Sequence, residues 1–176
     1  MHSATIPVVW AIIQYYIDST PHVLLQTTRK HWTEYHQKLE TPVWWIEQRE
    51  NVYTALDREV KEECWLTVTH INVQERSFGM HSQAVSPYLC VQQCAVWLPW
   101  ILLGFVCRAE WTLVHQDSES RDPHRVTHEQ LRMHLEQGDI FDLEVPLFMH
   151  YLSTYESITF EPFDDTFTRL PTQLNP

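Results

Sequence analysis

Glycine is scarce in this chain. Only 3 of its 176 residues are glycine, whereas average usage of about 7% would give about 12. Tryptophan is abundant instead, with 8 residues, and Trp97 and Trp111 stand where turn residues are expected. Turns and helix ends that need a left-handed backbone must then be built from residues with a Cβ, which costs roughly 1–2 kcal/mol at each such position.

We expect no segment that crosses a membrane or directs secretion. The longest apolar run, residues 95–107, contains Pro99 and is too short to span a bilayer, so it indicates a buried strand. Residues 1–5 carry neither the basic nor the apolar region of a signal peptide. We therefore expect a cytoplasmic protein without a membrane partner.

Basic residues are outnumbered, and ligand patterns for zinc are missing. With 12 Lys and Arg against 23 Asp and Glu, the formal net charge is −11, which argues against a nucleic-acid groove because such a groove needs a basic stripe. The four cysteines, at positions 64, 90, 94 and 107, form no zinc-type pair, and free thiols in a reducing compartment are expected. The 11 histidines show no convincing ligand spacing, so we assign them surface or packing roles.

Acidic residues at helical spacing are the most informative feature that is present. Glu59, Glu62 and Glu63 stand at i, i+3 and i+4, so a helix places all three on one face. Like charges on adjacent turns repel, and a hard divalent cation such as Mg²⁺ would compensate them. Glu50 precedes the helix and could reach the same site. The alternative interpretation is a solvated acidic helix face.

The spacing of these residues resembles the Nudix box. That motif is Gly-x5-Glu-x7-Arg-Glu-U-x-Glu-Glu-x-Gly-U, where U is aliphatic. Residues 44–66 supply every charged position of the box, including Arg58, and both aliphatic positions, Val60 and Leu66. Both glycines are replaced, by Trp44 and Trp65.

The resemblance implies an activity and a set of metal ligands. Nudix hydrolases use Mg²⁺ or Mn²⁺ to cleave the pyrophosphate of a nucleoside diphosphate linked to another group. By this resemblance Glu59, Glu62 and Glu63 would be metal ligands and Glu50 a fourth acidic contributor. Glu59 and Glu62 would also be catalytic. Glu119 lies where several family members place an acidic catalytic residue, and its alternative is an exposed loop acid.

Substrate contacts are suggested by the same resemblance. Residues 39–43, Leu-Glu-Thr-Pro-Val, resemble the Leu-Glu-x-Pro-Ala segment of ADP-ribose pyrophosphatases, which points to Glu40. Arg29 and Arg58 are the other substrate-binding candidates. The expected partner is a small-molecule nucleotide such as ADP-ribose or a nucleoside triphosphate, and a homodimer stays open.

The lost glycines put activity in question. The second glycine of the box ends the helix, where a left-handed residue is common, so Trp65→Gly should raise stability by about 1 kcal/mol. The first lies in a loop near the metal and the phosphates, where Trp44 and Trp45 would crowd the approach. Either the chain has been altered, or its loops are built differently from those of its relatives.

Two other function classes therefore stay open beside the hydrolase. One is an impaired Nudix-like domain that binds a nucleotide or metabolite without turnover. The other is an interaction protein in which the acidic helix is only a surface. Four retained glutamates favour the hydrolase, because a site without activity has no need of them.

The pattern of elements predicts one α+β domain. Strands are expected over 5–16, 22–28, 41–46, 66–73, 88–92 and 101–109, with helices over 51–64, from Thr127 to Gly138, and from Pro146. The first helix should pack through an apolar stripe of Val52, Ala55, Leu56 and Val60. By the resemblance this becomes an α/β/α sandwich around a mixed sheet, with residues 1–156 as the domain and 157–176 as an extended arm or tail.

Overall fold

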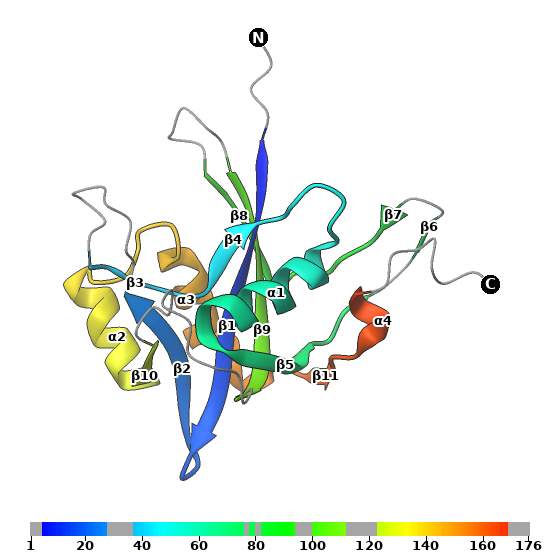
Figure 1. Ribbon diagram of the computed structural model, residues 1–176. Coiled ribbons are helices and arrows are strands. Elements are labelled where there is room, and N and C mark those ends of the chain that lie inside the picture. Colours follow the sequence, from blue (N-terminus) through cyan, green and yellow to red (C-terminus); the bar gives the residue numbers. More distant parts are fainter. Residues whose placement is uncertain are drawn as a thin grey trace.

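The computed structural model describes residues 5–27, 37–75, 78–79, 82–93, 100–111 and 123–168. Along them Figure 1 shows β1 (Ile6–Ile17), β2 (Thr20–Thr27), β3 (Leu39–Glu40), β4 (Val43–Trp45), α1 (Val52–Cys64), β5 (Leu66–Asn72), β6 (Phe78–Gly79), β7 (Ser82–Gln83), β8 (Leu89–Gln93), β9 (Trp100–Trp111), β10 (Pro123–Thr127), α2 (His128–Gln137), α3 (Val145–Thr154), the short 3-10 helix η1 (Tyr155–Ser157), β11 (Phe160–Pro162) and α4 (Asp165–Thr168).

Two long strands, β1 and β9, form the centre of a mixed sheet. They run parallel to each other, and the order across the sheet is β10-β2-β1-β9-β5-β11. On the side away from β9, β1 pairs with β4 through its first half and with β2 through its last residues. In the same way β9 pairs with β8 near its start and with β5 near its end. The expected mixed sheet is confirmed.

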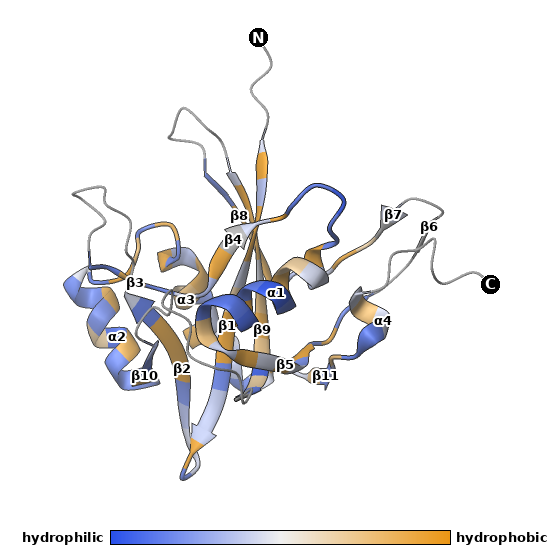
Figure 2. Cartoon of the chain, in the orientation of Figure 1, coloured by the Kyte–Doolittle hydropathy of each residue, from blue (hydrophilic) through white to orange (hydrophobic). Residues whose placement is uncertain are grey.

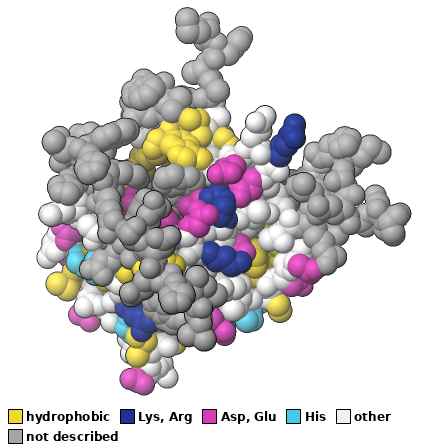
Figure 3. All heavy atoms as spheres, viewed as in Figure 1, with side chains coloured by type: hydrophobic (Ala, Val, Ile, Leu, Met, Phe, Trp, Pro, Cys, Tyr) yellow, Lys and Arg dark blue, Asp and Glu magenta, His cyan; other side chains and the backbone are white. Residues whose placement is uncertain are grey.

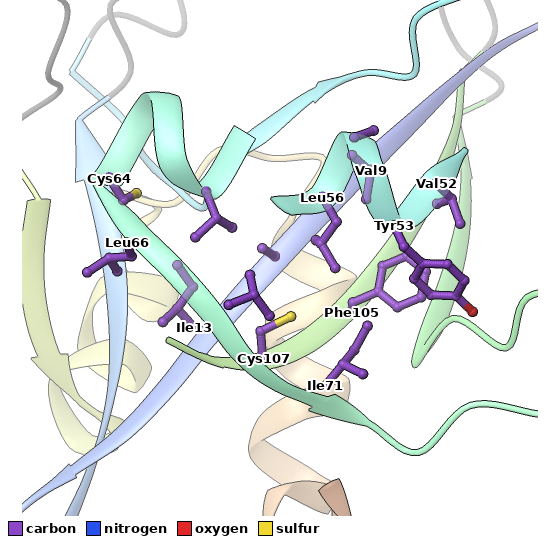
Figure 4. Packing of buried hydrophobic residues seen from close by; sticks show 14 of the residues in the cluster. Val9, Ile13, Val52, Tyr53, Leu56, Cys64, Leu66, Ile71, Phe105 and Cys107 are labelled. Atoms are coloured by element: carbon purple, nitrogen blue, oxygen red, sulfur yellow. The ribbon is translucent and has the colours of Figure 1, made fainter. Parts of the chain in front are cut away.

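Strand β1 is buried on both of its faces, and its residues alternate between two cores. Val9, Ala11 and Ile13 pack in a cluster with the apolar side of α1. Val8, Trp10 and Ile12 pack in the other cluster, with α2 and α3. Successive side chains of a strand point to opposite faces, so the sheet lies between two helical layers. Figure 2 shows the apolar centre of the sheet, and Figure 4 shows the packing beneath α1.

Helix α1 has the boundaries that its sequence predicts. The side chain of Asn51 accepts hydrogen bonds from the backbone N–H groups of Tyr53 and Thr54, at 2.9 and 2.8 Å. At the other end Trp65 takes the left-handed conformation, with φ 54° and ψ 35°, as expected for the position of the second box glycine. The predicted apolar stripe is buried: Val52, Ala55, Leu56 and Val60.

The helices on the other face also follow their sequence signals. Thr127 and Gln130 form a reciprocal capping box at the start of α2, and Gly138 ends that helix with φ 73°. Leu131 of α2 and Leu147 of α3 are fully buried in the second cluster. His128 is buried too, and its ring contacts Tyr151, which fits the expected packing role for histidines.

Several described elements were not expected from the sequence. Residues 123–127 form β10, which pairs with β2, and β6 and β7 form a small hairpin within the expected loose segment 74–87. Beyond residue 157, β11 pairs with β5 and the fully buried Phe167 of α4 joins the cluster beneath α1. Cys64, Cys90 and Cys107 are free thiols.

Candidate active site on helix α1

Arg58 organises the charged face of α1. Its Nε donates to Oε1 of Glu50 at 2.8 Å, and its Nη2 donates to Oε2 of the same carboxylate at 2.9 Å. This is the two-point geometry in which a guanidinium binds a carboxylate most strongly. It connects the loop before α1 to the middle of the helix.

The same guanidinium contacts two further glutamates. Its Nη1 donates to Oε1 of Glu59 and, at 3.4 Å, to Oε2 of Glu62. The Glu59 residue is only 4% exposed, whereas the Glu62 side chain is 63% exposed. Three carboxylates thus surround one cation, and Figure 3 shows acidic and basic side chains gathered on this face beside a hydrophobic patch.

Glu63 points in a different direction from the other three glutamates. Its Oε2 accepts a hydrogen bond of 2.6 Å from Nε2 of Gln26 and one of 3.3 Å from the backbone N–H of Val43. The residue is 7% exposed. Glu63 therefore lies at the junction between the charged face of α1 and strands β2 and β4.

The pKa values of two glutamates beside Arg58 shift in opposite directions. Burial raises the pKa of Glu59 to about 7, and Glu63 and Glu62 add to this rise, although Arg58 opposes it. In contrast, the hydrogen bond from Arg58 lowers the pKa of Glu50. The guanidinium therefore stabilises the ionised form of Glu50, whereas burial makes Glu59 harder to ionise in spite of its contact with Arg58.

The donor set suits a hard divalent cation. The side chains around Arg58 offer carboxylate oxygens, the ligands that Mg²⁺ prefers, and Mg²⁺ commonly needs only one or two carboxylates because it keeps several waters. Among the described residues, no group of three or more carboxylate, imidazole or thiol side chains is already placed to hold a metal ion. The cluster thus fits such an ion by chemistry and charge, with ligation shared with water or phosphate.

The remaining predicted site residues lie on β3 or outside the described residues. Glu40 is fully buried in β3, opposite Gln26 of β2. Arg29 and Glu119 fall outside the described residues, as does the side chain of Trp44. The roles in catalysis, metal binding and substrate binding stay predictions for all of these residues.

Sequence reasoning missed Gln26. It follows three apolar residues of β2, Val23, Leu24 and Leu25, and a polar side chain in that setting is the signal that could have identified it. A buried amide needs hydrogen-bond partners, and Glu63 is the partner here.

A hollow of about 550 Å³ lies elsewhere, between β10, β3 and α2. It is lined by Leu39, Pro123, His124, Arg125, Val126 and His134. None of the box glutamates lines it, so it is not part of the site on α1.

None of the described helices has the length and apolar character needed to cross a membrane.

Comparison with known proteins supports the fold. No model of a protein family matches the sequence, and no curated protein matches it. Among solved structures, the ORF135 protein of E. coli is 18% identical with a TM-score of 0.63, covering 88% of this chain and 94% of its own.

Two further solved structures are named as Nudix proteins. A NUDIX hydrolase from Nitrosomonas europaea is 17% identical, with a TM-score of 0.57, and covers 88% of this chain and 90% of its own. The NUDIX domain of Shewanella oneidensis NrtR, complexed with ADP ribose, is 12% identical, with a TM-score of 0.62 and the same coverage of both chains. The α/β/α sandwich, the box at residues 44–66 and these neighbours agree, and the chain has the Nudix fold.

Proposed function

We propose that this chain is a Nudix-type, metal-dependent pyrophosphohydrolase. Its substrate would be a nucleoside diphosphate linked to another group, with ADP-ribose as the first candidate. The observation that carries the proposal is the arrangement of Glu50, Glu59 and Glu62 around Arg58, with Glu63 beside them on the same helix. A fold neighbour complexed with ADP ribose supports the ligand class.

Each charged residue has a role that follows from its contacts. Arg58 holds Glu50 and Glu59 in place, and the buried Glu59 and Glu63 present carboxylates from a rigid helix. Glu62 is exposed and its hydrogen bond from Arg58 is long, at 3.4 Å, so it can turn toward a bound ligand. When bound, Mg²⁺ or Mn²⁺ would reverse the sign of the local charge, polarise a phosphoryl oxygen and lower the pKa of a water.

The acidic cluster alone would repel a pyrophosphate. Added positive charge would offset this repulsion, and it would also favour the ionised form of Glu59, whose pKa burial raises to about 7. Glu59 and Glu62 stay the candidates for moving a proton from water, together with Glu119.

Binding without turnover is the second candidate function. It is favoured by the replacement of both box glycines, by Trp44 and Trp65, since a small residue at the first position would leave room for phosphates. Trp45 directs its backbone carbonyl oxygen to Arg58, at 3.5 Å from Nη2, whereas its ring packs edge-to-face on Trp100, with 5.1 Å between ring centroids, in the cluster with α2 and α3.

A hydrolysis assay separates the candidates. Release of AMP from ADP-ribose is measured with Mg²⁺, with Mn²⁺ and with a chelator, for the wild type and for the double variant Glu62→Gln, Glu63→Gln. The matched control is Glu129→Gln, Glu136→Gln, because both residues are exposed on α2. We expect metal-dependent release that the first double variant loses and the control keeps. Metal-dependent ligand binding with no release from any nucleoside diphosphate derivative would support the second candidate.

A further inference from the structure

Gln26 is buried where the strand pattern calls for an apolar side chain. On β2, Leu24 packs in the cluster beneath α1, and a residue two positions later points to the same face of the sheet. Gln26 is nonetheless fully buried there. Burying an amide costs free energy unless it is hydrogen-bonded, so the residue is retained at a cost to the core.

The partners of Gln26 determine the orientation of its amide. Nε2 lies 2.6 Å from Oε2 of Glu63 and 3.4 Å from the carbonyl oxygen of Thr41. Both partners are acceptors, so the NH2 group and not the carbonyl oxygen must face them. The Oε1 atom of Gln26 is buried without a hydrogen-bond partner among the described residues, a further cost of placing an amide here.

This amide restricts how Glu63 can turn. The Gln26 N–H and the backbone N–H of Val43 bind the same carboxylate oxygen, Oε2, from β2 and β4. A carboxylate held from two strands keeps one plane, whereas a free glutamate on a helix samples several. Holding a ligand group in one geometry before binding lowers the ordering cost that binding must overcome.

We infer that Gln26 is a positioning residue for Glu63: it orients the Glu63 carboxylate for divalent-cation binding at the site on α1. The inference rests on the proposed function and adds a residue outside the box to it. Removing a residue that hydrogen-bonds a metal-ligating group typically lowers metal affinity about 10- to 100-fold.

Thr41, one of the two partners of Gln26, is also hydrogen-bonded to a residue on the opposite side of the sheet. The Thr41 backbone N–H donates to Oε2 of Glu144 at 2.8 Å, and Glu144 is the fully buried residue that precedes α3. Gln26, held between Glu63 and the Thr41 carbonyl, therefore belongs to a polar connection between α1, the β3–β4 segment and the start of α3. These hydrogen bonds restrain the Gln26 amide from two directions.

The test compares two buried glutamines. Gln26→Met keeps the length of the side chain and removes the donor. The matched control is Gln14→Met: Gln14 is 1% exposed on β1, and its Nε2 donates to the Tyr16 hydroxyl at 3.2 Å instead of to a box residue. Should Gln26→Met not fold, Gln26→Asn keeps an amide but is one methylene too short to hold Glu63.

Three quantities are measured on each full-length protein: the Mn²⁺ dissociation constant by calorimetry, the temperature of unfolding without metal, and kcat and KM at saturating Mn²⁺. We expect Gln26→Met to weaken Mn²⁺ binding about 10- to 100-fold and to lower kcat with little change in KM. Gln14→Met should bind Mn²⁺ as the wild type does, whatever its loss of stability.

Two results would overturn the inference, and they differ. If the wild type binds Mn²⁺ and Gln26→Met binds it within about twofold of that affinity, Gln26 is only a structural residue and the proposed function stands. If the wild type itself does not bind Mn²⁺, the proposed function and the positioning role fail together.

Discussion

Trp65 offers a direct test of backbone strain at the end of α1. Its φ of 54° and ψ of 35° lie in the left-handed region, where a residue with a Cβ costs roughly 1–2 kcal/mol and glycine does not. We predict that Trp65→Gly is more stable than Trp65→Ala by about 1 kcal/mol. Inside an ordinary helix the order is reversed, because alanine is better than glycine by nearly the same amount.

Comparing these two variants removes the contribution of the indole. Trp65 is partly buried, so the simple change Trp65→Gly combines relief of strain with loss of apolar burial, at about 25 cal/mol per Å². The burial loss opposes the gain of about 1 kcal/mol expected from the sequence alone. Both variants lose the same indole, so the difference between them reports the backbone.

Gly138 provides an internal reference for the cost of a left-handed residue with a Cβ. Gly138 has φ +73° and a Cβ built on it meets nothing within 4 Å, so Gly138→Ala measures the left-handed cost without a clash. About 1 kcal/mol corresponds to a shift of about 2–4 °C in the unfolding temperature of a domain of this size. If Trp65→Ala unfolds at or above the temperature of Trp65→Gly while Gly138→Ala is destabilised, the strain argument at Trp65 is refuted.

Two further predictions concern pH and the C-terminal segment. Because burial raises the pKa of Glu59 from the ordinary 4.5 to about 7, its contribution to stability is present below about pH 4.5 and is lost as the pH rises through 7. The loss is at most about 3 kcal/mol, and Glu59→Gln should flatten this part of the metal-free stability profile between pH 5 and 8. Phe167→Ala should cost about 3–4 kcal/mol in urea unfolding, because Phe167 is fully buried against Tyr53; a cost below about 1 kcal/mol would show that α4 is a dispensable arm.

The parts of the fold that the sequence predicted are those with strong local signals. Asn51 and the apolar stripe of α1 define that helix by capping and periodicity, and the Thr127 capping box with Gly138 does the same for α2. Strand β1 was evident because both of its faces are apolar. In each case neighbouring residues alone determine the element.

The elements that were missed depend on distant partners. Residues 123–127 are mostly polar and partly exposed, and they become β10 because β2 offers an edge for pairing. Residues 160–162 contain a proline and become β11 against β5. No local periodicity marks such short edge strands, since their stability comes from pairing.

In the candidate site, too, some residues could be predicted from local sequence and others depend on distant partners. The box spacing predicted the glutamates and Arg58, because one helix carries most of them. The role of Gln26 needed the structure, since its partner Glu63 lies 37 positions away. The burial of Glu40 likewise follows from the packing of β3 against β2, which the segment 39–43 does not reveal.

Calorimetric titration of Mn²⁺ into the metal-free protein tests the central claim, that the acidic face of α1 is a metal site. The account predicts saturable binding by the wild type and by Glu129→Gln, Glu136→Gln, and a loss of at least about tenfold in affinity in Glu62→Gln, Glu63→Gln. No binding by the wild type, or binding of equal strength in the Glu62 and Glu63 double variant, would contradict it.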